Sequence, residues 1–359
     1  MLKSKGKEGG KINHLDSVPV KKEEVKVIVT PKVFLASRQS IKEFLIEKGL
    51  FLFTILSSIL IFFVFIFVVK EAWPVLRANG LAIVFTAGWD QDFYRAWVAT
   101  AKEPSWHFGA LPLIVGTFFT TLGALCFTVP LGLGCAIFLV EVCPPWFFKP
   151  VESTVRLLSA IPSVIYGLVG LLVVVPWIDR HLVTNEMSLR MAKVAALDGT
   201  SLLAGILVLG MMIVPIFVAL AADALRAVPK TYKEGSLALG ISHWRTIVKI
   251  MLPGAKKGII AGAILATGRA IGEAIALSMV SGSVANIPNP SHGLVFFLEP
   301  LRTLASTVVD NAEGMGVPTC ESALFACGAF LLVSCVILSF FARWVARSKE
   351  IGGKLNGEK

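Results

Sequence analysis

Six apolar runs divide this sequence, and each is long enough to cross a lipid bilayer as a helix. A helix needs about 20 mostly apolar residues to span the hydrocarbon core. Because backbone amides and carbonyls find no water there, the run must satisfy their hydrogen bonds internally. Charged residues make up 16% of the chain and gather between the runs. The sequence therefore predicts an all-α polytopic membrane protein, with six transmembrane helices at residues 50–69, 111–140, 157–177, 201–222, 258–282 and 322–342.

The second run, residues 111–140, is longer than one crossing requires. Excess length can be accommodated when a helix tilts, and a proline inside a helix removes a hydrogen bond and bends the axis. We therefore expect either an interfacial segment or a tilted helix that breaks near Pro130.

Lysine and arginine are divided unevenly between the segments that flank the runs. The two ends of the chain and every second loop hold 25 of these residues, whereas the alternate loops hold 8. The first set comprises residues 1–49, 141–156, 223–257 and 343–359, and the second set 70–110, 178–200 and 285–321. Basic residues favour the cytoplasmic side, so we expect both termini and loop 223–257 in the cytoplasm. This bias accounts for most of the net charge of +10, which gives no reason to expect a nucleic-acid partner.

The basic loop at residues 226–256 carries the most specific motif in the chain. It has the form E-x5-G-x9-I-x-L-P and consists of Glu234, Gly240, Ile250, Leu252 and Pro253.

Local propensities suggest how this loop folds. Residues 230–239 and 241–251 can each form a short helix, and Gly240 can end the first because glycine tolerates a positive φ. Pro253 is then expected to turn the chain toward the next span. A helix–glycine–helix unit of this kind can insert into a groove on a partner and transmit its movement. The alternative is a basic connecting loop with an incidental turn.

The fifth run contains two charged residues, Arg269 and Glu273. A charge at the centre of a membrane helix costs at least about 2.5–3.5 kcal/mol on insertion scales, so both side chains should face protein or water. In a continuous helix their i,i+4 spacing would bring them within pairing distance. Either Arg269 attracts an anion while Glu273 holds the guanidinium or accepts a hydrogen bond, or the two neutralise each other and hold helices together.

Glycines spaced four apart accompany these charges in the fifth run. Gly258 and Gly262 form one such pair, and Gly268 and Gly272 form another. Small residues at this spacing let a second helix approach closely. We therefore expect the fifth helix to line a pathway or to contribute to a subunit interface.

Motifs for other classes of protein are missing from the sequence. No two cysteines form a CxxC pair, and the histidines have no metal-like spacing, so we expect no metal site. No GxxxxGK[ST] run is present, so ATP would have to be hydrolysed by another chain. We expect a permease subunit rather than an enzyme. An ion-coupled carrier could explain an intramembrane Arg–Glu pair, but it would leave the loop motif without a purpose.

The loop motif resembles the EAA-type signature of ABC importer permeases, in which this loop docks on an ATPase. Further stretches resemble the phosphate-specific members of that class, the PstC type more than its partner, the PstA type. The run GRAIGEAIALSMVSG at residues 268–282 is the strongest of these, and the resemblance covers about residues 80–345. The other matching stretches are 88–90, 109–117, 129–134, 161–171 and 304–306.

The resemblance implies a MetI-like type I ABC importer core that imports inorganic phosphate across the bacterial inner membrane by alternating access. The implied partners are a PstA-type subunit in a heterodimer, two copies of a PstB-type ATPase that uses ATP and Mg, a PstS-type phosphate-binding protein and membrane lipid. Arg269 and Glu273 would then be substrate-pathway residues. The ATPase contact would comprise Glu234, Gly235, Gly240, Ile250, Leu252 and Pro253. The alternatives are a PstA-type subunit or a permease for sulfate or molybdate.

Composition, the apolar runs and the resemblance together divide the chain into segments, and the N-terminal 45 residues lie outside the resemblance. We expect a disordered cytoplasmic tail at 1–45, a first transmembrane helix with an extracytoplasmic segment at 46–110, the importer transmembrane domain at 111–345 and a cytoplasmic tail at 346–359. Three residues depart from the family pattern. Gly235 and Ser236 stand where an alanine pair is expected, and Ser283 stands where asparagine is expected, near the outer gate.

Overall fold

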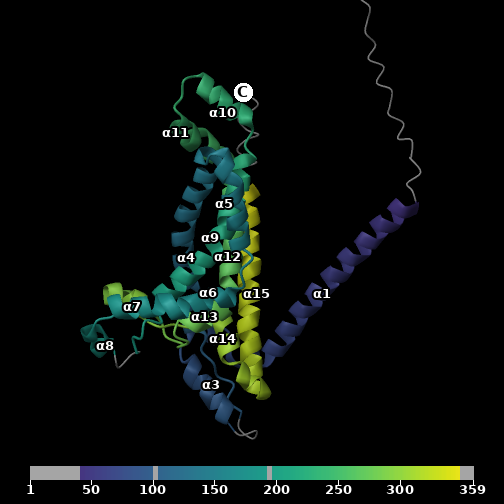
Figure 1. The fold of residues 1–359 in the computed structure, drawn as a ribbon. Helices are drawn as coiled ribbons and strands as arrows, with labels where there is room; N and C mark the ends of the chain where they lie inside the picture. Colours follow the sequence, from purple (N-terminus) through teal and green to yellow (C-terminus); the bar gives the residue numbers. More distant parts are fainter. Residues whose placement is uncertain (1–40, 100–103, 192–195, 348–359) are drawn as a thin grey trace, which may run out of the picture. The chain divides into compact units, whose positions relative to one another are not determined.

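The computed structural model describes residues 41–99, 104–191 and 196–347, which form helices with short connections (Figure 1). These residues contain no β-strand, although an isolated bridge pairs Gly282 with Leu301. The chain divides into two units, residues 1–59 and 60–359. Helix α1 (Ile41–Asn79) begins in the first unit and ends in the second.

The elements after α1 follow one another along the second unit. The helices are α2 (Ala82–Phe85), α3 (Trp89–Val98), α4 (Leu111–Ile137), α5 (Pro145–Leu158), α6 (Ser163–Val169), α7 (Val175–His181), α8 (Asn185–Met191), α9 (Leu202–Arg226), α10 (Lys230–Ala238), α11 (His243–Thr246), α12 (Leu252–Ile271), α13 (Ile275–Val280), α14 (Leu304–Asp310) and α15 (Pro318–Arg347). Wider π-helical turns extend or join them at η1 (Phe138–Val142), η2 (Gly170–Val174) and η3 (Ile247–Met251). Short 3-10 helices form at η4 (Pro290–Leu298) and η5 (Ala312–Gly316).

Both predicted tails lie largely outside the described residues. Residues 41–45, which we assigned to the N-terminal tail, belong to helix α1, which begins at Ile41. At the other end α15 continues to Arg347, past the predicted boundary at residue 345. The remainder of each predicted tail is not described.

Six helical segments of the described chain are long and apolar enough to cross a membrane, which confirms the predicted number. They cover Ile46–Asn79, Leu111–Val142, Ser163–His181, Leu202–Arg226, His243–Ile271 and Pro318–Phe341.

The predicted third and fifth spans have different limits from the observed ones. The third begins at Ser163 and not at residue 157, because α5 ends at Leu158 and Pro162 disfavours helical backbone at the residue before it. The fifth begins at His243, inside the motif loop, and ends at Ile271. It therefore starts earlier and stops earlier than the run of apolar residues suggested.

The fourth span, α9, lies at the centre of the bundle. In its most apolar window 67% of residues are buried, against at most 28% in the other spans. Glycines on α9 and α4 accept large side chains from the facing helix: a Cβ at Gly210 would lie 2.6 Å from the Phe127 ring, and one at Gly132 would lie 2.6 Å from the Phe217 ring. These reciprocal contacts let α4 and α9 approach closely without any charged group.

Helix α4 passes through Pro130 without a break, so the predicted interruption there is wrong. A membrane helix tolerates proline where neighbouring helices and side chains compensate for the lost hydrogen bond. The irregularity comes later, at the π-helical turn η1, which carries Glu141.

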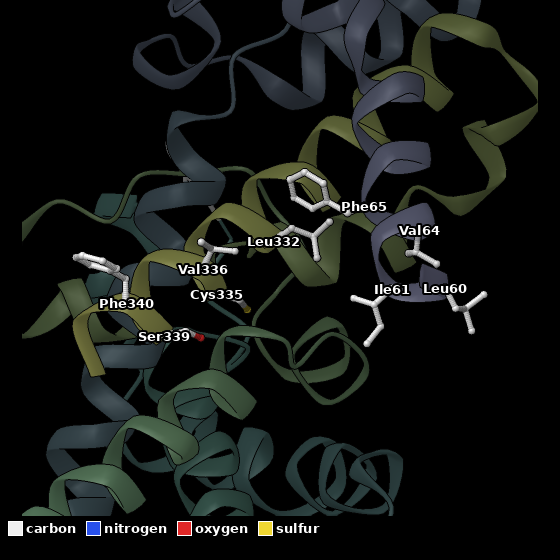
Figure 2. Close-up of a pocket in the computed structure, with 9 residues that line it drawn as sticks. All are labelled: Leu60, Ile61, Val64, Phe65, Leu332, Cys335, Val336, Ser339 and Phe340. Atoms are coloured by element: carbon white, nitrogen blue, oxygen red, sulfur yellow. The ribbon is translucent and has the colours of Figure 1, made fainter. Parts of the chain in front are cut away.

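An apolar groove of about 600 Å³ lies between the second-unit part of α1 and the last half of α15 (Figure 2). Its lining consists of Leu60, Ile61, Val64, Phe65, Leu332, Cys335, Val336, Ser339 and Phe340. No charged side chain lines it, and residues such as Val336 and Phe340 are exposed. The groove therefore suits lipid chains and offers nothing to hold an inorganic anion.

Gly258 and Gly262 of α12 pack against α9. A Cβ at Gly258 would lie 2.5 Å from the Ala224 Cβ, and one at Gly262 would lie 3.1 Å from the Leu220 Cβ. The second glycine pair is in more open surroundings, since a Cβ at Gly268 would first meet Leu338, at 3.9 Å.

We expect Gly258→Ala to destabilise the protein by about 1–3 kcal/mol, the usual cost of overpacking, even though alanine favours a helix. Gly268→Ala is the matched control, because it brings the same propensity gain without a clash. The measurement is the thermal unfolding midpoint of the purified protein in detergent. Equal midpoints for the two variants would show that α9 and α12 are not packed at Gly258.

Candidate functional site

The motif loop folds into two short helices joined at Gly240, as predicted. Helix α10 ends at Ala238 and α11 begins at His243. We call residues 230–246, which comprise α10, α11 and their connection, the elbow. In Figure 1 the elbow lies at one end of the second unit, and α3 lies at the other.

Backbone hydrogen bonds at Gly240 fix the angle of the elbow. Its φ is +75°, which glycine adopts without a steric penalty. The Gly240 amide donates to the Leu237 carbonyl at 2.9 Å, and the Ile241 amide donates to the Ser236 carbonyl at 3.2 Å. This pair of bonds is the Schellman motif, which ends a helix by satisfying its last carbonyls.

A buried pair of hydroxyls ties the two helices of the elbow together. Ser236 Oγ on α10 lies 3.0 Å from Thr246 Oγ1 on α11. Both residues are buried, and Ser236 also donates to the Lys233 carbonyl, at 2.8 Å. The elbow therefore has its own internal polar contacts.

Glu141 connects the elbow to the end of the second span. Its Oε2 lies 2.6 Å from Lys233 Nζ on α10 and 3.3 Å from His243 Nε2 on α11. The Glu141 side chain is only 2% exposed, whereas those of Lys233 and His243 are 31% and 47% exposed. A buried carboxylate needs such partners because desolvation is costly.

Other side chains of the elbow are exposed. Leu239 is 82% exposed, Trp244 65% and Tyr232 61%, a large exposed apolar area for one short segment. Glu234 is exposed on the same helix, and a Cβ at Gly235 would meet nothing within 4 Å. Exposed apolar side chains gathered in this way are typical of a protein interface.

The last three motif residues belong to the span itself and do not form a turn. Ile250 lies in η3, and Leu252 and Pro253 begin α12. Proline is compatible with the first turn of a helix, where its missing amide costs no hydrogen bond. The predicted turn at Pro253 is therefore wrong, and the helix runs on from the elbow into the membrane.

The fifth span ends between Arg269 and Glu273, so the expected i,i+4 geometry does not apply. Helix α12 stops at Ile271, and α13 starts at Ile275. Glu273 is 8% exposed, and its Oε1 accepts a hydrogen bond from the Ala276 amide at 3.1 Å. Glu273 thus satisfies the first turn of α13, and no ion pair joins it to Arg269 in the described part of the chain.

Arg269 lies in the last turn of α12 and is exposed. Within the described residues no carboxylate comes within ion-pair distance of its guanidinium. Tyr166 of α6 lies within electrostatic reach of Arg269, and its hydroxyl donates to the Leu158 carbonyl at 2.9 Å. An uncompensated cation at this position requires water, an anion or a partner protein around it.

At the end of the second unit opposite the elbow, Arg302 contacts three segments of the chain. Its Nη1 lies 2.6 Å from Asp90 Oδ1, its Nε lies 3.3 Å from Asp310 Oδ2, and a guanidinium nitrogen donates to the Ser283 carbonyl. Ser283 has a φ of +50° and donates from its hydroxyl to Asp310 at 2.8 Å. Asparagine is enriched at positive φ, which explains why it suits position 283. Burial raises the pKa of the Asp310 carboxyl, while the Ser283 hydrogen bond and Arg302 act against this shift.

Glu141 and Tyr166 were missed by the sequence analysis. A signal for Glu141 did exist, since it is a lone carboxylate between apolar residues directly after the second run. Tyr166 carried no comparable signal, because it is remote from Arg269 in the chain and only the fold brings the two within electrostatic reach.

Among known proteins, residues 128–351 match the family described as "Binding-protein-dependent transport system inner membrane component". The chain is 33% identical to the "Probable ABC transporter permease protein YqgH" of Bacillus subtilis (strain 168), over 71% of this chain and 76% of that protein. It is 30% identical to the "Phosphate transport system permease protein PstC" of Pasteurella multocida (strain Pm70), over 85% of this chain and 91% of that protein. Among solved structures, a bacterial alginate ABC transporter chain is similar with a TM-score of 0.49 and 15% identity, over 86% of this chain and 98% of that one.

Gly240→Ala should loosen the elbow, since a left-handed backbone costs a residue with a Cβ roughly 1–2 kcal/mol. We expect faster amide hydrogen exchange in α10 and α11 of this variant. Gly235→Ala is the control: it lies within α10, faces open space and should slow exchange slightly. Exchange at the wild-type rate in Gly240→Ala would contradict the assigned role of the glycine.

Proposed function

The chain belongs to the family of binding-protein-dependent transport system inner membrane components, and we propose that it imports inorganic phosphate as one subunit of an ATP-driven importer. It is a multi-pass inner-membrane permease subunit of the ABC transporter class. Relatives named as PstC phosphate permeases align with most of its length, which supports phosphate as the substrate. The proposed subunit is of the PstC type.

The exposed charge of Arg269 is the observation that carries this proposal. Its candidate partner, Glu273, forms no ion pair with it in the described chain, so internal neutralisation does not account for the arginine. An inorganic anion in the pathway would supply the missing negative charge. The planar guanidinium suits this role because it can donate two parallel hydrogen bonds to an oxyanion.

Glu273 is proposed to help distinguish phosphate from sulfate. Near neutral pH phosphate keeps a proton that it can donate, whereas sulfate has none. A fixed carboxylate close to Arg269 would accept that hydrogen bond and repel a fully deprotonated anion. The bond to Ala276 leaves the second carboxylate oxygen for this purpose.

A single helical segment links the elbow with Arg269. It runs over His243–Ile271, 29 residues, which corresponds to about 40 Å at the ~1.5 Å rise of a helix. We propose that the elbow lies in the cytoplasm with both termini and docks on one of two PstB-type ATPase copies that bind ATP and Mg. ATP-driven closure of the ATPases then moves α12 and exposes Arg269 to each side of the membrane in turn. A PstA-type subunit completes the pathway, and a PstS-type protein delivers phosphate from outside.

Two other functions remain as competitors. A PstA-type subunit or a permease for sulfate or molybdate would share the elbow and the six spans. An ion-coupled carrier would not need the exposed apolar side chains of Leu239 and Trp244 at the elbow. The ABC proposal accounts for both the elbow and the arginine.

Deletion of the gene for this chain tests the substrate directly. We expect high-affinity uptake of radioactive phosphate to be lost and to return with the wild-type gene, whereas uptake of sulfate and molybdate should be unchanged. Loss of sulfate or molybdate uptake with normal phosphate uptake would replace phosphate by that anion.

Substitutions at the two charged residues test their separate roles. Arg269→Gln should reduce phosphate uptake at least about 10-fold, as loss of a charged hydrogen bond of 1.5–3 kcal/mol implies, while the complex still assembles. Glu273→Gln retains an oxygen that can accept from the Ala276 amide, so it removes the charge and leaves the cap of α13 in place. We expect Glu273→Gln to lower phosphate uptake. Unaltered uptake by an assembled Glu273→Gln complex would remove the proposed selectivity role.

A further inference from the structure

Glu141 lies at the only described polar junction between the elbow and the second span. Within the described residues, the hydrogen bonds and ion pairs from α10 and α11 to the end of α4 all involve its carboxylate. Its partners, Lys233 and His243, belong to different helices of the elbow. One carboxylate therefore holds both helices to a third element.

The junction adds a second route by which movement can leave the elbow. The first is covalent, because α11 continues through η3 into α12. The second passes through Glu141 to η1 and then α4. The first element on each route, η3 on the covalent one and η1 on the one through Glu141, is a π-helical turn. Such turns occur frequently at functional positions.

Packing behind the junction favours a joint movement of the spans. The ends of α4 and α9 and the start of α12 share one apolar cluster that includes Ala136, Leu225 and Ala255. Val140, the neighbour of Glu141, packs against the same cluster. A displacement at Glu141 is therefore passed on into α4, because a close-packed interior has little room to deform.

We propose that Glu141 is a positioning residue that makes α4 follow the elbow, so that α4 and α12 move together during transport. The inference rests on the proposed import of phosphate. Because the side chain is buried and paired, loss of its charge weakens the attachment of both elbow helices at once. The ATPase would still dock on exposed elbow side chains such as Leu239 and Trp244, and would hydrolyse ATP with less movement of the pathway.

The test compares phosphate uptake with ATP hydrolysis in the same proteoliposomes, which contain the complete transporter complex. For Glu141→Gln we expect the phosphate carried per ATP to fall at least about fivefold, the lower end of couplings between sites, while the ATPase stays bound and active. Lys233→Met should act in the same direction. The double variant should be no worse than Glu141→Gln alone, because both substitutions break one contact.

Glu152→Gln is the matched control. Glu152 is also a carboxylate paired with basic groups, since it lies 3.0 Å from both Arg156 and Arg226, and it lies on α5 without an ion pair to the elbow. This variant should keep the wild-type amount of phosphate per ATP. A substitution that only destabilises the protein lowers uptake and hydrolysis together and leaves their ratio unchanged.

The outcomes separate this inference from the proposed function. If the wild-type complex takes up phosphate with ATP but Glu141→Gln keeps the same ratio, the inference alone is wrong. Additive losses in the double variant would also overturn it, because the two groups would then act independently. If the wild-type complex takes up no phosphate with ATP, the proposed function is wrong, and the inference falls with it.

Discussion

The absence of water from the hydrocarbon core is the constraint on which this structure depends. Every break in a membrane helix leaves amides and carbonyls that something else must satisfy. The break after Ile271 shows how this is met, because the Glu273 carboxylate accepts from the Ala276 amide at 3.1 Å. A residue first interpreted as the partner of Arg269 thus has a structural role in the fold. The arginine is left without a carboxylate partner in the described chain, which is the condition for binding a mobile anion.

In the elbow, too, the buried polar groups are paired with one another. Two buried hydroxyls, those of Ser236 and Thr246, close it internally, and the buried Glu141 carboxylate fixes it to the second span. The helix that begins at His243 then leads without a turn to Ile271, two residues beyond Arg269. Helix α12 packs closely on α9, because its Gly258 and Gly262 lie against Ala224 and Leu220. Arg269, near one end of this span, and the elbow at the other are therefore parts of one element.

The sequence predicted what depends on local composition. The number of spans follows from apolar runs of bilayer length, and the two helices of the elbow follow from the glycine between them. Family membership, too, was accessible from the loop motif and from residues 268–282, and the match to the family model agrees with it. The predictions that were wrong, and the contacts that were missed, depend on the structural surroundings of each residue. Helix limits at Pro253 and Ile271 could not be read from hydropathy, because a first-turn proline continues a helix and a polar side chain can sustain a break within an apolar run. The contacts of Glu141 and Tyr166 join residues that are remote in the chain, so a single sequence contains no pattern that reveals them.

The energy source of transport is the most direct test of the whole account. Proteoliposomes that contain the complete complex can be given ATP on the ATPase side or an imposed proton gradient, with phosphate and its binding protein on the other side. The account predicts that phosphate accumulates with ATP, and that collapse of the proton gradient has no effect. Accumulation that follows the proton gradient in the absence of ATP would contradict it, because the elbow would then have no force to transmit.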